Sequence, residues 1–169
     1  FLRHAFLDGA GEFGFRNHVV AEHNGAVVAT GAAWGHRSNP GFALAAARQI
    51  LTCYGPLVAP RVILRGLRIE SVIPPPSRGL HYLAHLGRQP EVRGQGAGGA
   101  LIEHLLAQGR AQGRAVAALD VAATNPRAQS LYERLGFQVT RERISHLANA
   151  QASVSSHRRM ELPLRDTRD

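Results

Sequence analysis

The feature that most constrains the fold is the segment 80–121, in which two apolar strands flank a glycine-rich turn and a helix. The run 115–121 is apolar at nearly every position, which is typical of a strand buried on both faces. The helix before it carries leucines at helical spacing, at Leu101, Leu105 and Leu106. This alternation of strands and helices predicts an α/β fold, with a sheet covered by helices on both faces.

The first half of the chain predicts a hairpin followed by two helices. Asn24-Gly25 is a two-residue turn signal between apolar runs, so residues 17–34 are predicted to form a β-hairpin. Asn39-Pro40 indicates a helix start, because Asn caps helices and Pro is tolerated at the first helical position. Gly55-Pro56 interrupts the helical pattern, so residues 57–67 are predicted to form a second helix.

The end of the chain adds one helix and two strands. Asn125-Pro126 begins the helix in the same way, and Gly136 stands where a glycine commonly ends one. Strands are predicted at 137–144 and at 157–164. No linker long enough to separate two domains is visible, so residues 1–169 are predicted to form a single domain.

Composition excludes several classes of protein. Hydrophobic residues make up 44% of the 169-residue chain and charged residues 19%, which is enough apolar material for a core. The single cysteine, Cys53, excludes an internal disulfide, and no histidine spacing predicts a metal site. No run of about 18 apolar residues predicts a membrane span. Because no signal-like segment opens the sequence, we expect a cytoplasmic protein.

The formal net charge of +8 raises the question of nucleic acid binding. All 20 basic residues are Arg, and they are spread along the chain without a long basic run. Because nucleic-acid-binding proteins concentrate their charge on one stripe or patch, this distribution argues against nucleic acid as the main partner. A small polyanionic ligand stays compatible with the charge.

The segment Arg93-Gly94-Gln95-Gly96-Ala97-Gly98-Gly99 lies between a predicted strand and a predicted helix. Its glycines let the main chain turn tightly and leave no Cβ to obstruct an anion. The free N–H groups and the dipole of the following helix favour negative charge at this point. Arg93 adds a charge-assisted contact, so the segment predicts a site for phosphate or pyrophosphate.

The same glycines also satisfy a dinucleotide-binding fingerprint. Gly94, Gly96 and Gly99 match G-x-G-x-x-G, and Asp120 lies 21 residues beyond the last of them. In that fold the first glycine directly follows the strand, whereas here residues 89–93 intervene. The chain after Asp120 is also too short to complete a doubly wound domain. We therefore favour a different phosphate site.

Two motifs at a fixed interval resemble those of the GNAT N-acetyltransferase superfamily. Leu86, Pro90 and Arg93–Gly98 are similar to its acetyl-CoA-binding signature, whose core is Arg-x-x-Gly-x-Gly. The second motif is similar to Asn-x-x-Ala-x-x-x-Tyr-x-x-x-Gly-Phe, and its residues are Asn125, Ala128, Leu131, Tyr132, Glu133, Leu135, Gly136 and Phe137. The interval between the motifs accommodates a helix, a strand and a loop, as in the family.

The resemblance implies a mixed sheet that splays between the strands at 80–88 and 115–121, with the pantetheine arm of acetyl-CoA in the opening. It implies that the cofactor is bound by Leu86, Gly87, Arg88, Arg93, Gly94, Gln95, Gly96, Ala97, Gly98, Asn125, Ala128 and Tyr132. Only 16 residues precede the hairpin, so the family's first strand is expected to be missing or supplied by another element. Residues 39–76 are expected to form a helical insertion near the acceptor site.

The implied activity is transfer of the acetyl group of acetyl-CoA to an amine acceptor by direct attack. Tyr132 stands where the family places a general acid, and its phenol can donate a proton. His81 and His85 are the first candidates for the base, with Tyr82 and Glu70 behind them.

Strand alternation predicts that His81 and His85 share one face and that Tyr82 lies on the other. The sequence does not specify the acceptor, and it leaves open a homodimer. It also leaves open the alternative of an inactive CoA-binding sensor or interaction module with the same fold.

Overall fold

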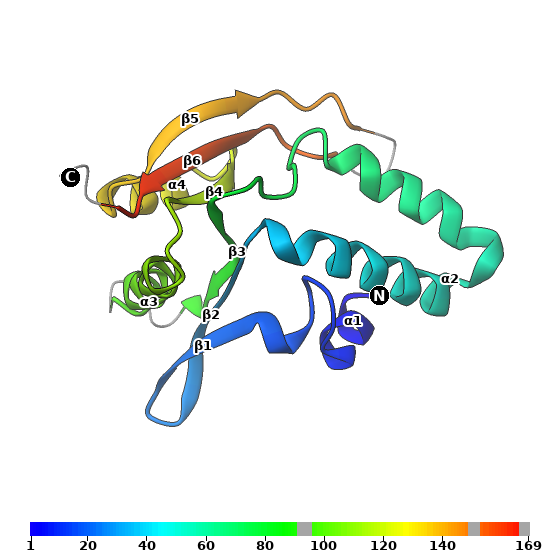
Figure 1. The fold of residues 1–169 in the computed structure, drawn as a ribbon, viewed down its shortest axis with the longest axis horizontal. Coiled ribbons are helices and arrows are strands. Elements are labelled where there is room, and N and C mark those ends of the chain that lie inside the picture. The colour runs from blue at the N-terminus through cyan, green and yellow to red at the C-terminus, as the bar shows by residue number, and fades with distance from the viewer. Residues whose placement is uncertain (91–95, 149–152, 166–169) are drawn as a thin grey trace.

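The computed structural model describes residues 1–90, 96–148 and 153–165 (Figure 1). Its centre is a six-stranded mixed sheet in the order β1-β2-β3-β4-β6-β5. The strands are β1 (His18–His23), β2 (Ala26–Trp34), β3 (Leu80–Arg88), β4 (Val116–Ala122), β5 (Gln138–Arg143) and β6 (His157–Pro163). The helices are α1 (Leu2–Asp8), α2 (Asn39–Ile69), α3 (Ala97–Ala111) and α4 (Pro126–Arg134), with 3-10 turns at Phe15–Asn17 and His36–Ser38. Helices flank both faces of this sheet, which confirms the predicted fold class.

The predicted hairpin is the first antiparallel pair of the sheet. Asn24 and Gly25 both have positive φ, of 51° and 75°, which is the two-residue turn that Asn-Gly favours because it matches the strand twist. Residues 1–17 contain α1 and a 3-10 turn and no strand, so in this chain the described sheet begins at β1.

The sheet opens between its two central strands. β3 and β4 run parallel, but they pair only at Leu80 with Val116, His81 with Ala117 and Tyr82 with Ala118. Beyond these pairs β4 continues alongside β6, whereas the far half of β3 has no strand partner on its β4 side within the part of the chain that the structure describes. This confirms the predicted splay, and it leaves main-chain N–H and C=O groups of β3 free to bond a ligand.

The core lies between the sheet and α3, which packs across β2 and β3. Its largest fully buried side chains include Phe137, Leu83, Ile102, Leu105, Leu106, Leu119 and Met160. The approach of α3 to the sheet is close, because a Cβ on Gly109 would lie 2.8 Å from both His81 Cδ2 and Leu164 Cδ1. Glycine at this position therefore sets the spacing between helix and sheet.

Helices α1 and α2 lie on the other side of the sheet, and most of α2 is exposed. The long helix α2 is interrupted at Gly55, whose φ of 71° and ψ of 169° are not helical, and Pro56 follows. The predicted break is confirmed, and Figure 1 shows the second limb turning back beside the first. The first limb contacts the sheet through Phe42, whose ring packs edge-on against Trp34 at 5.4 Å between centroids.

One helical segment, His36–Ile69, is long and apolar enough to cross a membrane by length and composition, because an 18-residue window within it has a mean hydropathy of 1.2. The kink at Gly55 divides it into two limbs. Each limb is shorter than the roughly 20 residues that a spanning helix needs.

Candidate functional site

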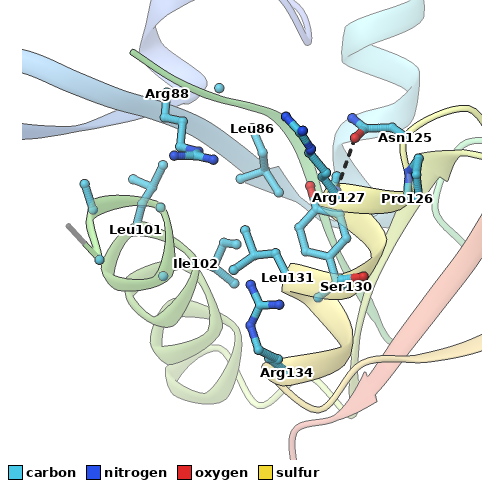
Figure 2. A pocket seen from close by; sticks show the side chains of 17 residues that line it. Leu86, Arg88, Leu101, Ile102, Asn125, Pro126, Arg127, Ser130, Leu131 and Arg134 are labelled. Carbon is cyan, nitrogen blue, oxygen red and sulfur yellow. Dashed lines mark hydrogen bonds between the residues drawn. The ribbon is translucent and has the colours of Figure 1, made fainter. Parts of the chain in front are cut away.

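A cavity of about 800 Å³ lies between the far half of β3, the start of α3 and helix α4 (Figure 2). Its apolar lining comes from Leu86, Leu101, Ile102 and Leu131. Three arginines also line it, Arg88 from β3 and Arg127 and Arg134 from α4 (Figure 2). No acidic side chain is among the described residues of the lining, so the cavity favours an elongated ligand that is both apolar and anionic.

The N-terminus of α3 faces this cavity. Gly96 caps the helix with a φ of 81°, a conformation that glycine adopts without strain, and no side chain in the described ranges bonds the free N–H groups of the first turn. Among the described residues, nothing lies within 4 Å of a Cβ on Gly96 or Gly99, which leaves space for a ligand beside this end of the helix. The predicted cofactor residues Gly96, Ala97 and Gly98 all line the cavity, whereas Arg93, Gly94 and Gln95 lie outside the described residues.

Helix α4 supplies the other wall. The Asn125 side chain caps α4 by accepting a hydrogen bond from the Ala128 N–H at 3.1 Å, and both residues line the cavity with Tyr132. The Tyr132 ring packs edge-on against Phe137, with centroids 6.1 Å apart. Burial raises the pKa of the Tyr132 phenol, so the hydroxyl keeps its proton at neutral pH.

A β-bulge in β3 changes which side chains face the cavity. Thr30 pairs with Gly87 and Ala32 with Ala84, so His85 and Leu86 together lie opposite Gly31. His85 has a φ of 54°, in the left-handed region. The extra residue reverses the alternation of side chains beyond it.

The prediction that His81 and His85 share a face is therefore wrong. His81 lies under α3, where its Nε2 donates to the Leu105 carbonyl at 2.9 Å, and its ring is 1% exposed. His85 lies on the opposite face with Tyr82, because both rings contact Trp34, at 5.6 Å and 5.7 Å between centroids. Burial lowers the pKa of His81, and its position under the helix suits packing better than contact with an acceptor.

His85 is held in place by three neighbouring rings. It stacks on Phe13 with centroids 5.0 Å apart, and Trp34 lies on another side. Its Nδ1 lies 3.1 Å from Nε2 of His18, and the two ring planes differ by only 12°. Burial, and then the neighbouring His18, lower the pKa of His85 to about 4.

The other candidates for a base are placed less favourably. Tyr82 donates its hydroxyl proton to Asp120 Oδ2 at 2.9 Å, and burial raises its pKa strongly. Glu70 is exposed at the end of α2. Sequence reasoning missed His18, because it lies 67 residues from His85 and no local motif connects them.

Asp120, the acidic residue of the alternative dinucleotide fingerprint, does not face the cavity. Its carboxylate is 1% exposed and accepts hydrogen bonds from Tyr82 and Arg159 on the other face of the sheet. It is therefore not placed to contact a ribose at the start of α3, which removes the structural basis for that interpretation.

Comparison with known proteins agrees with this geometry. The family model described as the acetyltransferase (GNAT) family matches residues 4–137. The chain therefore belongs to the GNAT acetyltransferase family, whose members use acetyl-CoA. No curated protein shows a significant match to the sequence.

Solved structures share the fold at low sequence identity. A ribosomal-protein-S18-alanine N-acetyltransferase from Escherichia coli is 19% identical, with a TM-score of 0.54 over 96% of this chain and 86% of that one. A putative acetyltransferase from Salmonella typhimurium, solved with its cofactor acetyl-CoA, is 19% identical, with a TM-score of 0.57 over 90% and 66%. An N-acetyltransferase from Staphylococcus aureus Mu50 is 14% identical, with a TM-score of 0.57 over 88% and 67%. At these identities the similarity defines the fold.

Proposed function

We propose that this protein is an N-acetyltransferase that transfers the acetyl group of acetyl-CoA to an amine acceptor. The observation that carries the proposal is the cavity at the opening of the sheet. It combines an uncapped helix N-terminus, three arginines and the unpaired main chain of β3.

The residues of the cavity fit the three chemical parts of acetyl-CoA. The first turn of α3 and Arg88 suit the diphosphate, because free N–H groups and a guanidinium stabilise anionic oxygens. The unpaired main chain of Leu86 and Gly87 suits the amides of the pantetheine arm, as an added strand would. Arg127 and Arg134 suit the remaining phosphate of the nucleotide. Acetyl-CoA, when bound, supplies an activated thioester.

His85 is the residue best placed to accept a proton from the acceptor amine. His18 Nδ1 lies 2.9 Å from the Gly14 carbonyl, which can only accept, so His18 must donate through this atom. In neutral His18 the Nε2 atom is then a bare acceptor, and His85 must donate to it through Nδ1. The Nε2 atom of neutral His85 is therefore unprotonated and carries a free lone pair, and no described residue bonds it.

Each of the two proton transfers in the reaction can now be assigned to a residue. As the amine nitrogen bonds to the acetyl carbon and the carbon–sulfur bond breaks, His85 Nε2 takes the amine proton. Tyr132 gives its phenolic proton to the departing thiolate and is reprotonated from solvent. His85 can pass its Nδ1 proton to His18 Nε2 along their shared hydrogen bond, so positive charge need not stay beside the acceptor.

Two measurements test this proposal and separate it from the alternative of an inactive CoA-binding module. Calorimetry with acetyl-CoA should show binding, and a panel of primary amines should release free CoA thiol and yield the N-acetyl product. Binding without turnover of any amine would favour the sensor or interaction module. Absence of binding at saturating acetyl-CoA would overturn the proposal itself.

A further inference from the structure

A second cavity, of about 390 Å³, lies on the face of the sheet opposite the cofactor cavity. Strands β5 and β6 line it together with the proline-rich loop that follows α2. Its side chains include three arginines, Arg141, Arg143 and Arg159, and one carboxylate, that of Glu161. No residue of this cavity belongs to the GNAT motifs considered above.

Two of these arginines, Arg143 and Arg159, lie beside one buried carboxylate, that of Asp120. Arg159 donates from Nε to both oxygens of Asp120 at 3.1 Å and from Nη2 to Oδ2 at 2.8 Å. Its Nη2 also lies 3.4 Å from the Pro74 carbonyl, and its guanidinium lies 5.3 Å from the centre of the Tyr82 ring. The side chains of Asp120 and Arg159 are 1% and 7% exposed, so this pair is a fixed part of the wall.

Arg143 is the member of the cluster whose hydrogen bonds are not satisfied. Its Nη1 lies 3.8 Å from Asp120 Oδ1, close enough for attraction but too far for a hydrogen bond. This Nη1 is buried and has no partner among the described residues, and the side chain as a whole is 21% exposed. Since Asp120 is already satisfied by Arg159 and Tyr82, the charge of Arg143 lacks a full counterpart, which is costly for a group largely removed from water.

The charges of the cavity leave room for an anion. The three arginines of the lining, counted with the carboxylates of Glu161 and Asp120, give a net charge of about +1. None of the arginines lies within ion-pair distance of Glu161 among the described residues. Ser77 and Thr140 add hydroxyl groups to the lining.

The cavity is also close to the opening of the sheet. Tyr82 and Ala118 form the last pair between β3 and β4, and Asp120 lies two residues further along β4. Because Tyr82 donates to Asp120, the arginine cluster is connected directly to the point where the strands part. Trp34 continues this row of side chains to His85.

We propose that the cavity lined by Arg141, Arg143 and Arg159 binds an anionic group, a carboxylate, on the amine acceptor. This inference rests on the proposed function, because it assigns the two faces of the sheet to the two substrates. The acceptor would place its carboxylate against Arg143 and direct its amine toward the opening of the sheet, where β3 and β4 part. The volume of the cavity suits a small acceptor of amino-acid size.

The test compares acceptors that differ only in the anionic group, with acetyl-CoA saturating. Leucine and leucinamide form one pair, and phosphoethanolamine and ethanolamine form a second pair that distinguishes phosphate from carboxylate. We expect kcat/KM for leucine to exceed that for leucinamide at least tenfold. The amine of leucinamide is less basic than that of leucine, so a larger fraction of it is unprotonated near neutral pH. This difference alone favours leucinamide and therefore opposes the expected preference for leucine. If the ratio of kcat/KM for phosphoethanolamine over ethanolamine exceeded the ratio for leucine over leucinamide, the group bound would be a phosphate. That result would overturn the assignment of a carboxylate.

Substitutions assign the preference to the cavity. Arg143→Gln should remove most of the preference for leucine and leave kcat/KM for leucinamide unchanged, and Arg143→Lys should restore part of it. Arg141 is exposed, so Arg141→Gln preserves folding and should reduce the preference by a smaller factor. Arg61→Gln, which removes an exposed arginine of α2, is the matched control and should change neither acceptor. Equal losses for both acceptors in Arg143→Gln would overturn the inference.

A binding measurement keeps the inference separate from the proposed function. Calorimetric titration of the protein with leucine and with leucinamide, with and without CoA, does not require turnover. If CoA fails to bind but leucine binds in a manner that depends on Arg143, the proposed function fails and an anion site remains. If CoA binds and neither kinetics nor calorimetry distinguishes leucine from leucinamide, the inference fails and the proposed function remains.

Discussion

The two faces of the sheet are built in different ways. The face under α3 and α4 takes its cavity from a few short continuous segments, namely the far half of β3, the first two turns of α3 and helix α4 with its cap. The face under α1 and α2 brings together side chains from distant segments, such as His18 with His85 and Asp120 with Arg159. A site made of backbone and local caps leaves a motif in the sequence, whereas a site made of side-chain contacts across strands does not.

The largest expected effect tests the face under α1 and α2. His85→Gln keeps a polar side chain but removes the lone pair that we assign as the proton acceptor. We expect kcat to fall by about 10²–10³, the usual range for loss of a general base. The affinity for acetyl-CoA should stay unchanged, because His85 lies on the opposite face from the cofactor cavity.

A matched pair of substitutions distinguishes the base from a packing residue. His81→Gln removes an imidazole from the same strand but on the α3 face, so it should lower stability with little effect on kcat in the remaining folded protein. His18→Asn should lower kcat less than His85→Gln does, because it removes the positioning hydrogen bond and keeps the base. If His81→Gln lowered kcat as much as His85→Gln, the assignment of the base would be contradicted.

The next largest effect is expected at Tyr132, which lines the cofactor cavity. Tyr132→Phe removes the proton donor and keeps the ring that packs on Phe137. We expect kcat to fall by about 10–100-fold with the Kd for acetyl-CoA unchanged. Measurement of the rate against pH and against the acidity of the leaving thiol checks the role, since acyl donors with a more acidic thiol should lose less. An unchanged rate with acetyl-CoA across pH would exclude Tyr132 as the acid.

The sequence predicted the face under α3 and α4, which carries the cofactor cavity, in more detail than the face under α1 and α2. The Asn125 cap and the glycine at the start of α3 have local signals, because caps and turns depend on residue type at fixed positions. The splay of the strands was predicted from the resemblance to the family. The reversal at His85 could not be predicted from alternation, since a bulge depends on how β3 pairs with β2. The arginine cluster likewise depends on the pairing of β4 with β6 and on the fold of the loop after α2.

A third prediction concerns the spacing between α3 and the sheet. Gly109→Ala would place a Cβ 2.8 Å from both His81 and Leu164, so the helix must shift or the neighbours must repack. We expect the free energy of unfolding to fall by about 1–3 kcal/mol, the usual cost of overpacking. Gly66→Ala is the matched control, because a Cβ there meets nothing within 4 Å and the substitution should stabilise the helix by about 0.5–1 kcal/mol. Chemical denaturation of both variants measures the difference.

A fourth prediction returns to the arginines of the cofactor face. Arg127→Gln and Arg134→Gln should each raise the Kd for acetyl-CoA by about three- to tenfold, since each removes one charge-assisted contact with phosphate. The effect should shrink as salt is added, because both side chains lie at the cavity rim. Calorimetry at two salt concentrations measures both changes. A loss of acceptor affinity without a change for acetyl-CoA would reverse the assignment of the two faces.

A fifth prediction is a pH dependence of stability that arises from the face under α1 and α2. The pKa of His85 is lowered to about 4 from an ordinary value of 6.5, so between these values the unfolded chain binds more protons than the folded protein. Stability therefore rises with pH across this window, and it is lost as the pH falls from about 6.5 toward 4. His85→Gln should flatten the dependence of the unfolding free energy on pH in this window, and the difference from the wild-type protein should stay constant above pH 7.5. A parallel slope in the two proteins would show that His85 is not held neutral by its burial beside His18, and it would weaken the case that its Nε2 is a free acceptor.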